Sequence, residues 1–211
     1  MNDARHDSTG LMLVISAPSG TGKSTLIRRL SREFQGFAFS VSCTTRAPRA
    51  GEVHGREYHF LTRDDFLARQ ESGFFAEWAE VHGHFYGTPR QATEDLLAQG
   101  RDVIFDIDVQ GARQLKASIG HGCFIFVFPP SREVLEQRLT GRGTDSQETI
   151  ARRLAGAKHE ICDSHWFDHW IVNDNLSVAY DQLRAIYVAE KTRPLYHAAW
   201  QKTIATQWGI E

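Results

Sequence analysis

The chain is poor in cysteine, with three among its 211 residues. Cys43, Cys123 and Cys162 are odd in number and widely spaced, so they exclude a disulfide framework and the close pairs of a cysteine metal cluster. Cys123 begins an apolar run, and we expect it to be a small core residue. This cysteine usage favours a reducing compartment, so we expect a cytoplasmic protein.

Long apolar runs and an excess of charge of one sign are also absent. No run approaches the about 18 apolar residues of a membrane span, which excludes a membrane protein. Residues 1–7 lack the apolar core of a signal peptide, and we expect 1–9 to be a flexible tail. A formal net charge of −2 gives no bulk attraction to nucleic acid or to anionic membranes. Any anion site must therefore be local.

One segment has the composition of a phosphate-binding loop. It reads Ala17-Pro18-Ser19-Gly20-Thr21-Gly22-Lys23-Ser24-Thr25, between the apolar run 11–15 and a helical pattern. Gly20 and Gly22 let several N–H groups point at one anion at a helix N-terminus. Lys23 can reach the β- and γ-phosphates of a nucleotide, and the Ser24 hydroxyl can bind Mg²⁺. Ala17 stands where the pattern begins with glycine, and the alternative is an ordinary glycine-rich turn.

The spacing of apolar runs predicts the fold class. Runs at 11–15, 103–107, 123–128 and 170–172 are typical of strands buried on both faces of a parallel sheet. Helical patterns at 23–34, at 91–99 and from Ser131 separate these runs. We expect a single α/β domain over 1–211, with a P-loop NTPase-type parallel sheet and helices on both faces. Its core is expected to comprise 10–36, 91–140 and 161–195.

Two segments interrupt this alternation. In the first, 37–90, residues 37–42 alternate with period two and predict a strand with one wet face, and Thr62 is placed to cap a helix. We expect 37–90 to be a small mixed α/β insertion that carries ligand contacts.

In the second segment, 141–160, glycines flank an arginine, and Asp145 and Glu148 can cap a helix that carries Arg152 and Arg153. This composition is typical of a helical lid over phosphates, and the alternative is a solvated helical hairpin.

Two further clusters carry charge suited to phosphates and metal. Arg46 and Arg49 flank a proline turn, where an anion would relieve their mutual repulsion, although such a pair can also be plain surface charge. The run 103–107 ends in carboxylates. By strand alternation, Asp106 and Asp108 share a face, and we expect them to support Mg²⁺. Helix capping is the alternative, because Gly111 soon follows.

At this point the chain resembles the guanylate kinases, which transfer the γ-phosphoryl group of MgATP to GMP. The resemblance extends from the P-loop to about Asn175 and rests on six blocks in order. They are Ser19-Gly20-Thr21-Gly22-Lys23-Ser24, Ser42-Cys43-Thr44-Thr45-Arg46-Ala47-Pro48-Arg49-Ala50-Gly51-Glu52, Glu77-Trp78-Ala79 with Tyr86-Gly87-Thr88, Asp106-Ile107-Asp108-Val109-Gln110-Gly111, Gly141-Arg142-Gly143-Thr144, and Ile171-Val172-Asn173-Asp174.

The resemblance implies a set of site residues. For GMP or dGMP, the phosphate would contact Arg46, Arg49, Tyr58 and Tyr86, and the base would contact Ser42, Glu77, Thr88 and Asp108. For ATP, the resemblance implies residues 17–25 and Asn173, and the catalytic set would be Lys23, Arg46, Arg138, Arg142 and Arg153. Mg²⁺ would bind Ser24 and, directly or through water, Asp106. Thr88 keeps the hydroxyl of the serine that other members have.

Two other functions stay open on the sequence alone. One is a P-loop kinase for another phosphorylated small molecule, and the other is a non-catalytic guanylate kinase-like module that binds proteins. Oligomeric state, the roles of the histidines near the GMP region, and the segment 196–211 are not determined by any of these patterns.

Overall fold

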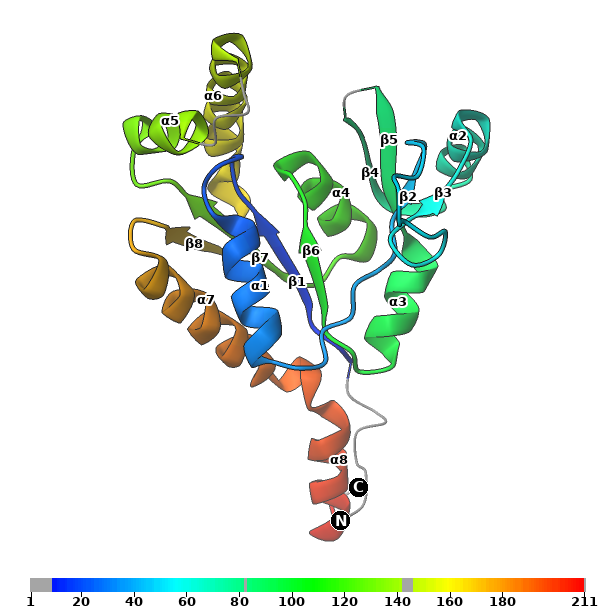
Figure 1. The fold of residues 1–211 in the computed structure, drawn as a ribbon. Helices are drawn as coiled ribbons and strands as arrows, with labels where there is room; N and C mark the ends of the chain where they lie inside the picture. Colours follow the sequence, from blue (N-terminus) through cyan, green and yellow to red (C-terminus); the bar gives the residue numbers. More distant parts are fainter. Residues whose placement is uncertain (1–8, 82, 142–145, 211) are drawn as a thin grey trace.

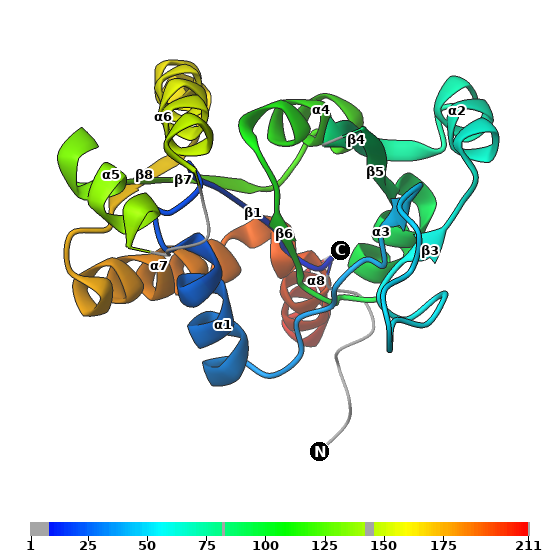
Figure 2. The ribbon, with the colours of Figure 1, turned by 45° about the horizontal axis from the view of Figure 1, so that its top comes forward.

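The computed structural model describes residues 9–81, 83–141 and 146–210. Its centre is a parallel four-stranded sheet in the order β6-β1-β7-β8, with helices on both faces (Figures 1 and 2). The strands are β1 (Met12–Ser16), β6 (Val103–Asp106), β7 (Cys123–Phe128) and β8 (His169–Val172). The predicted α/β fold class is therefore confirmed, and each strand lies within about a residue of the apolar run that predicted it.

The central sheet is buried because alternate residues of each strand enter two separate cores. Leu13 and Ile15 of β1 pack beneath α1 (Lys23–Glu33) and α7 (Leu176–Lys191). Met12 and Val14 pack on the other face with α3 (Arg90–Ala98) and α4 (Val109–Ile119). Both faces of β1 are apolar for this reason, as is typical of a parallel sheet covered on both sides.

Helix starts follow the capping signals in the sequence. Thr62 caps α2 (Arg63–Glu71) through the backbone N–H of Asp65, and Ser131 caps α5 (Arg132–Thr140) through that of Val134, both as predicted. The lid helix α6 (Gln147–Cys162) is capped by Ser146, whose hydroxyl accepts from the Thr149 N–H. Of the predicted capping pair, Glu148 lies in the first turn of α6, and Asp145 lies outside the described residues.

A second, smaller sheet lies in the segment 37–90. It has the order β3-β2-β5-β4, formed by β2 (Cys43–Thr44), β3 (His59–Phe60), β4 (Phe75–Val81) and β5 (His84–Pro89). The predicted strand at 37–42 is wrong. Only Ala38 pairs there, in an isolated bridge to Val103, and Phe39 is 60% exposed, so the segment is a connection from one sheet to the other.

The last helix of the described structure is α8 (Ala198–Gln207), which follows a short 3₁₀ turn at Pro194–Tyr196. Another 3₁₀ turn, at Asp163–Trp166, precedes β8. Figure 1 shows α8 extending from the end of the sheet opposite the α5–α6 pair. Trp200 and Trp208 on this segment are 64% and 79% exposed. Among the helices in the described ranges, none combines the length and apolar character needed to cross a bilayer.

A buried carboxylate ties the central sheet to α7. Asp102, 8% exposed, accepts hydrogen bonds from the Leu11 N–H at 2.8 Å, the Tyr187 hydroxyl at 2.7 Å and the Lys191 ammonium at 2.7 Å. Burial and the hydrogen bond to Asp102 raise the pKa of Tyr187 above its usual range. A buried carboxylate is costly without such partners, so the three donors explain why it is tolerated.

We expect Asp102→Asn to lower the free energy of unfolding by about 2–4 kcal/mol, because the amide loses the charge pair with Lys191 and offers an N–H group to existing donors. Urea unfolding followed by circular dichroism measures this loss. Asp181→Asn, at an exposed position on α7, is the matched control and should change stability by under about 0.5 kcal/mol. Equal stability of the two variants would refute the role assigned to Asp102.

Candidate functional site

The loop between β1 and α1 has the geometry of an anion-binding turn. Gly20 and Gly22 adopt φ values of 92° and 100°, which residues with a Cβ rarely adopt. A Cβ at Gly22 would also lie 2.5 Å from the Asn173 amide nitrogen. In the described structure, the start of α1 has neither a side-chain cap nor an acidic residue in its first turn. Its N–H groups are therefore available to an anion.

Lys23 and Ser24 meet the end of β6 at this loop. The Lys23 ammonium lies 2.7 Å from Asp106 Oδ1 and donates to the Ile107 carbonyl at 3.0 Å. The Ser24 hydroxyl donates to Asp106 Oδ2 at 3.4 Å. A hydroxyl and a carboxylate side by side next to a phosphate-binding loop are the oxygen donors that Mg²⁺ prefers, so these residues fit that ion.

A pocket of about 440 Å³ opens over the loop. It is lined by Ala17, Pro18, Ser19, Gly20, Gly22, Lys23, Ser24, Thr25, Arg28, Asp108 and Glu160. Thr21 is instead buried beneath the loop, where its carbonyl accepts from the Asn173 amide at 2.7 Å and from Arg138 at 3.3 Å. Arg138 and Asn173 thus hold the loop from behind, and both line a smaller cavity of about 230 Å³ on that side.

Helices α5 and α6 bring further cations to the loop. Arg153 of α6 contacts the Ser19 hydroxyl at 3.5 Å, and Arg138 of α5 also donates to the Asn173 carbonyl at 3.0 Å. Arg142, the other predicted lid arginine, lies outside the described residues. Two of the three lid arginines therefore lie at the phosphate loop, on two different helices.

The second sheet carries a separate cationic cluster. The Arg46 guanidinium binds both oxygens of Glu52, at 2.9 and 3.0 Å, and lies 5.5 Å from the Tyr58 ring centre. The Tyr58 and Tyr86 rings are 6.0 Å apart, edge to face. Arg49 is exposed and uses its backbone N–H to bind Glu52 at 2.7 Å. Hydrogen bonds from these two arginines lower the pKa of Glu52, which keeps it charged beside Arg46.

A buried carboxylate lies further along the same sheet. Glu77 is 7% exposed and accepts a 2.5 Å hydrogen bond from the Thr88 hydroxyl, which lies 3.5 Å from that of Ser42. Burial first, and then the nearby Asp108 charge, raise the pKa of Glu77 to about 7, although the Thr88 bond lowers it. A Cβ at Gly111 would lie 3.1 Å from Glu77 Oε2, so glycine leaves room for the Glu77 carboxylate there.

Asp108 connects the two halves of the site. β6 ends at Asp106, so the predicted sharing of a strand face by Asp106 and Asp108 is wrong. Asp108 is instead the N-cap of α4, and its carboxylate accepts from the Gly111 N–H at 2.8 Å. The cap position places Asp108 in the lining of the phosphate-loop pocket and within electrostatic range of Glu77.

The family model for guanylate kinase matches residues 10–190, which include both halves of this site. The chain belongs to the guanylate kinase family. It is 61% identical over 186 residues to a guanylate kinase of Oleidesulfovibrio alaskensis, covering 88% of this chain and 90% of that one. It is 59% identical over 202 residues to one of Nitratidesulfovibrio vulgaris, covering 96% and 98%.

A solved guanylate kinase has the same fold over nearly the whole chain. The crystal structure of the enzyme from Anaplasma phagocytophilum matches with a TM-score of 0.71 at 33% identity, covering 98% of this chain and 100% of that one. Fold and family thus agree with the resemblance seen in the motifs.

Two carboxylates of this guanylate kinase family member escaped the sequence reasoning. Glu52 binds Arg46, and its position three residues after Arg49 is the sequence signal for this contact. Glu160 lines the phosphate-loop pocket. It lies seven positions after Arg153, so both side chains lie on one face of α6. Burial raises the pKa of Glu160 to about 7, opposed by Lys23 and reinforced by Asp108.

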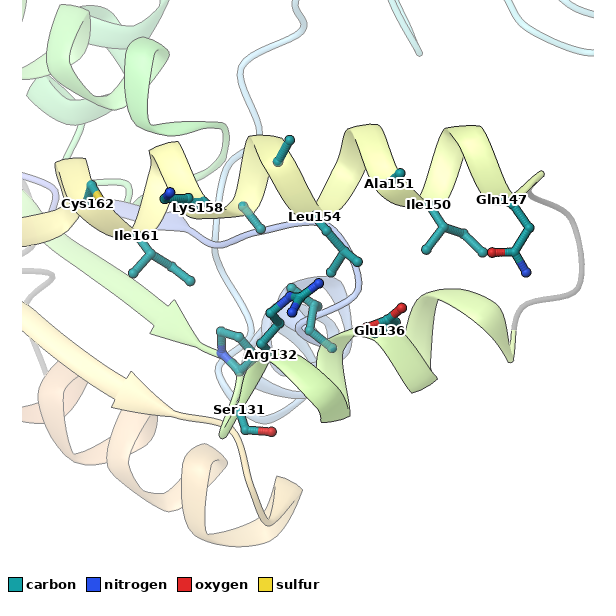
Figure 3. A pocket seen from close by; sticks show the side chains of 14 residues that line it. Ser131, Arg132, Glu136, Gln147, Ile150, Ala151, Leu154, Lys158, Ile161 and Cys162 are labelled. Carbon is teal, nitrogen blue, oxygen red and sulfur yellow. The ribbon is translucent and has the colours of Figure 1, made fainter.

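A larger cavity, of about 780 Å³, lies between the two lid helices (Figure 3). Ile150 and Leu154 of α6 point toward α5 across it, and small residues such as Ala151 complete its apolar lining. Its walls carry none of the predicted nucleotide-binding residues. Beside this cavity, α6 packs on α5 through a small buried cluster formed by Leu135, Leu139, Ile150 and Ala157.

Glu77→Gln should change how stability depends on pH. A carboxyl whose pKa rises from 4.5 to about 7 on folding destabilises the folded state progressively as pH rises between these values, because the unfolded chain loses its proton first. The amide cannot titrate. We expect the variant to gain about 2 kcal/mol of stability relative to the parent between pH 5 and pH 8, measured by urea unfolding.

The control for this pH experiment is Glu80→Gln, an exposed carboxylate on the same strand. The free energy of unfolding of this variant should depend on pH as that of the parent protein does, across the same range. A difference in unfolding free energy between Glu77→Gln and the parent that stays constant with pH would contradict the raised pKa of Glu77.

Proposed function

We propose that this chain transfers the γ-phosphoryl group of MgATP to GMP, and also to dGMP, giving ADP and the nucleoside diphosphate. The observation that carries the proposal is the position of Asp108, which lines the phosphate-loop pocket and neighbours the buried carboxylate of Glu77. A triphosphate on the loop and a purine at Glu77 would then lie on either side of Asp108. Family membership supports the same reaction.

The base contacts would select guanine. Guanine presents donors at N1 and N2 and an acceptor at O6. The carboxylates of Glu77 and Asp108 suit the donors, while the hydroxyls of Ser42 and Thr88 suit O6. Adenine has no N1 proton and would leave a buried carboxylate facing an acceptor, which a site rejects strongly.

The phosphate of GMP would lie against Arg46, Arg49, Tyr58 and Tyr86. Its second pKa is about 6, so the attacking oxygen is already largely ionised at neutral pH and needs no general base. Arg46 would then exchange one of its Glu52 contacts for the phosphate, whose oxygens match the guanidinium fork.

The ATP side would use residues 17–25 for the phosphates, Asn173 near the base, and Lys23, Arg138, Arg142 and Arg153 as catalytic cations. Mg²⁺, held by Ser24 and Asp106, would offset phosphate charge when bound with ATP. The protein's task is to align two polyanions and exclude water from them.

We also propose that the regions 37–90 and 141–160 close over the two substrates while the core of 10–36, 91–140 and 161–195 stays fixed. The α5–α6 pair has its own small apolar cluster, separate from the cores beneath the central sheet, which supports its motion as a unit. Cys43, Cys123 and Cys162 are free thiols, which supports function in a reducing cytoplasm.

A coupled assay of ADP release tests the reaction with GMP, dGMP, AMP, UMP and no acceptor. We expect turnover with GMP and dGMP alone. In Glu77→Ala, we expect kcat/KM for GMP to fall about 100-fold or more, with KM for ATP changed by less than about threefold, because the substitution removes only the base contact.

The control variant for this assay is Glu80→Ala, which should keep the parent's kinetics. Turnover with another acceptor would support a different P-loop kinase, and none above background would favour a non-catalytic binding module. Equal loss of GMP and ATP use in Glu77→Ala would overturn the assignment of the base site.

Arg46→Lys keeps the charge but loses the planar fork. We expect kcat/KM for GMP to fall by about 10- to 100-fold, because one ammonium cannot replace paired N–H donors on the phosphate and on Glu52. Arg56→Lys, in the exposed part of the same segment, should stay within about threefold of the parent. Steady-state kinetics with varied GMP measures kcat/KM for each variant. A near-parent value for Arg46→Lys would exclude bidentate binding of the phosphate by Arg46.

A further inference from the structure

A cluster of three potential metal ligands lies at the edge of the central sheet opposite the phosphate loop. Cys123 begins β7, His169 begins β8, and Glu190 lies in the last turn of α7. One ligand atom from each, a sulfur, a ring nitrogen and a carboxylate oxygen, lies within 4.8 Å of the others. Neighbouring parallel strands bring the first two together, and α7 packs across them.

We propose that Cys123, His169 and Glu190 form a binding site for a zinc-like divalent transition metal. Sulfur, imidazole nitrogen and carboxylate oxygen form a ligand set suited to Zn²⁺ or Co²⁺ and unsuited to Mg²⁺ or Ca²⁺, which prefer oxygen alone. This site is separate from the proposed magnesium position at Ser24 and Asp106.

The distances are close to those that a tetrahedral metal needs. Metal–ligand bonds of about 2.0–2.3 Å place neighbouring ligand atoms about 3.3–3.7 Å apart. His169 Nε2 and Glu190 Oε1 are already 3.8 Å apart, so the remaining closure toward Cys123 is about 1 Å at most. The His169 side chain is 37% exposed and can supply this movement by rotation, while Cys123 stays buried in the strand.

The surroundings provide an orienting partner and a neighbouring pocket. Arg193 donates to Glu190 Oε2 at 3.0 Å, which leaves Oε1 directed at His169. Such a second partner is what fixes a metal-binding carboxylate in orientation. A pocket of about 350 Å³ lies on the Glu190 side of the cluster, with Asp168, Arg193 and Lys116 also in its lining. A water molecule could complete the coordination as fourth ligand.

The charges near the Cys123 sulfur are the carboxylates of Glu190 and Asp168 and the guanidinium of Arg193. The two carboxylates would stabilise a divalent ion, which replaces the thiol proton on binding. The alternative is that Cys123 is an ordinary core residue beside a surface ion pair of His169 and Glu190. Metal titration distinguishes these two possibilities.

The experiment titrates metal-free, full-length protein with Zn²⁺ against a competing chromophoric chelator, and with Co²⁺ in an absorption spectrometer. We expect one tight site with a dissociation constant of about 1 μM or below, a higher Tm with Zn²⁺, and a sulfur-to-cobalt charge-transfer band in the near ultraviolet. Because the site lies at the far edge of the sheet, kinase turnover with MgATP should be unchanged by the metal.

Three variants identify the ligands. Cys123→Ser should abolish the charge-transfer band, and His169→Gln should weaken Zn²⁺ binding at least about tenfold. Cys162→Ser removes an exposed thiol and is the matched control, which should bind as the parent does. If Cys123→Ser does not fold, the partly exposed His169→Gln variant and the cobalt spectrum of the parent still decide. Absence of the band, or undiminished binding in His169→Gln, would overturn the site.

Discussion

The common direction of the four central strands is the constraint on which the functional regions depend. Because the sheet is parallel, the loops after β1, β6, β7 and β8 all leave from one edge. That edge gathers Lys23, Asp106, Asp108 and Asn173 from positions up to 150 residues apart. The opposite edge receives the strand starts, among them Cys123 and His169. The nucleotide chemistry and the proposed metal site are therefore separated by the length of a strand.

Much of this arrangement could be predicted from the sequence because its causes are local. Uninterrupted apolar runs mark strands buried on both faces, and Thr62 and Ser131 begin helices by bonds to N–H groups three residues on. The phosphate loop depends on glycines within one turn. The family resemblance then supplied what local patterns could not, namely a proposal for which residues of the small sheet contact GMP.

The failures have equally physical causes. Residues 37–42 alternate like a strand, yet strand pairing depends on a partner, and the chain is crossing between sheets there. Glu160 takes part in the site only because α6 folds back over the loop. The cluster of Cys123, His169 and Glu190 joins residues 21 to 67 positions apart, so no motif spacing could reveal it.

The buried Glu77 carboxyl gives acceptor selection a link to acidity. Because burial raises its pKa to about 7, a share of the ligand-free molecules at neutral pH hold a proton on the group proposed to accept from guanine. Binding of the base would draw on the ionised molecules and release protons. Glu160, whose pKa is also raised to about 7, gives the phosphate-loop pocket a carboxyl that titrates in the same range, so a falling pH would act on both halves of the site.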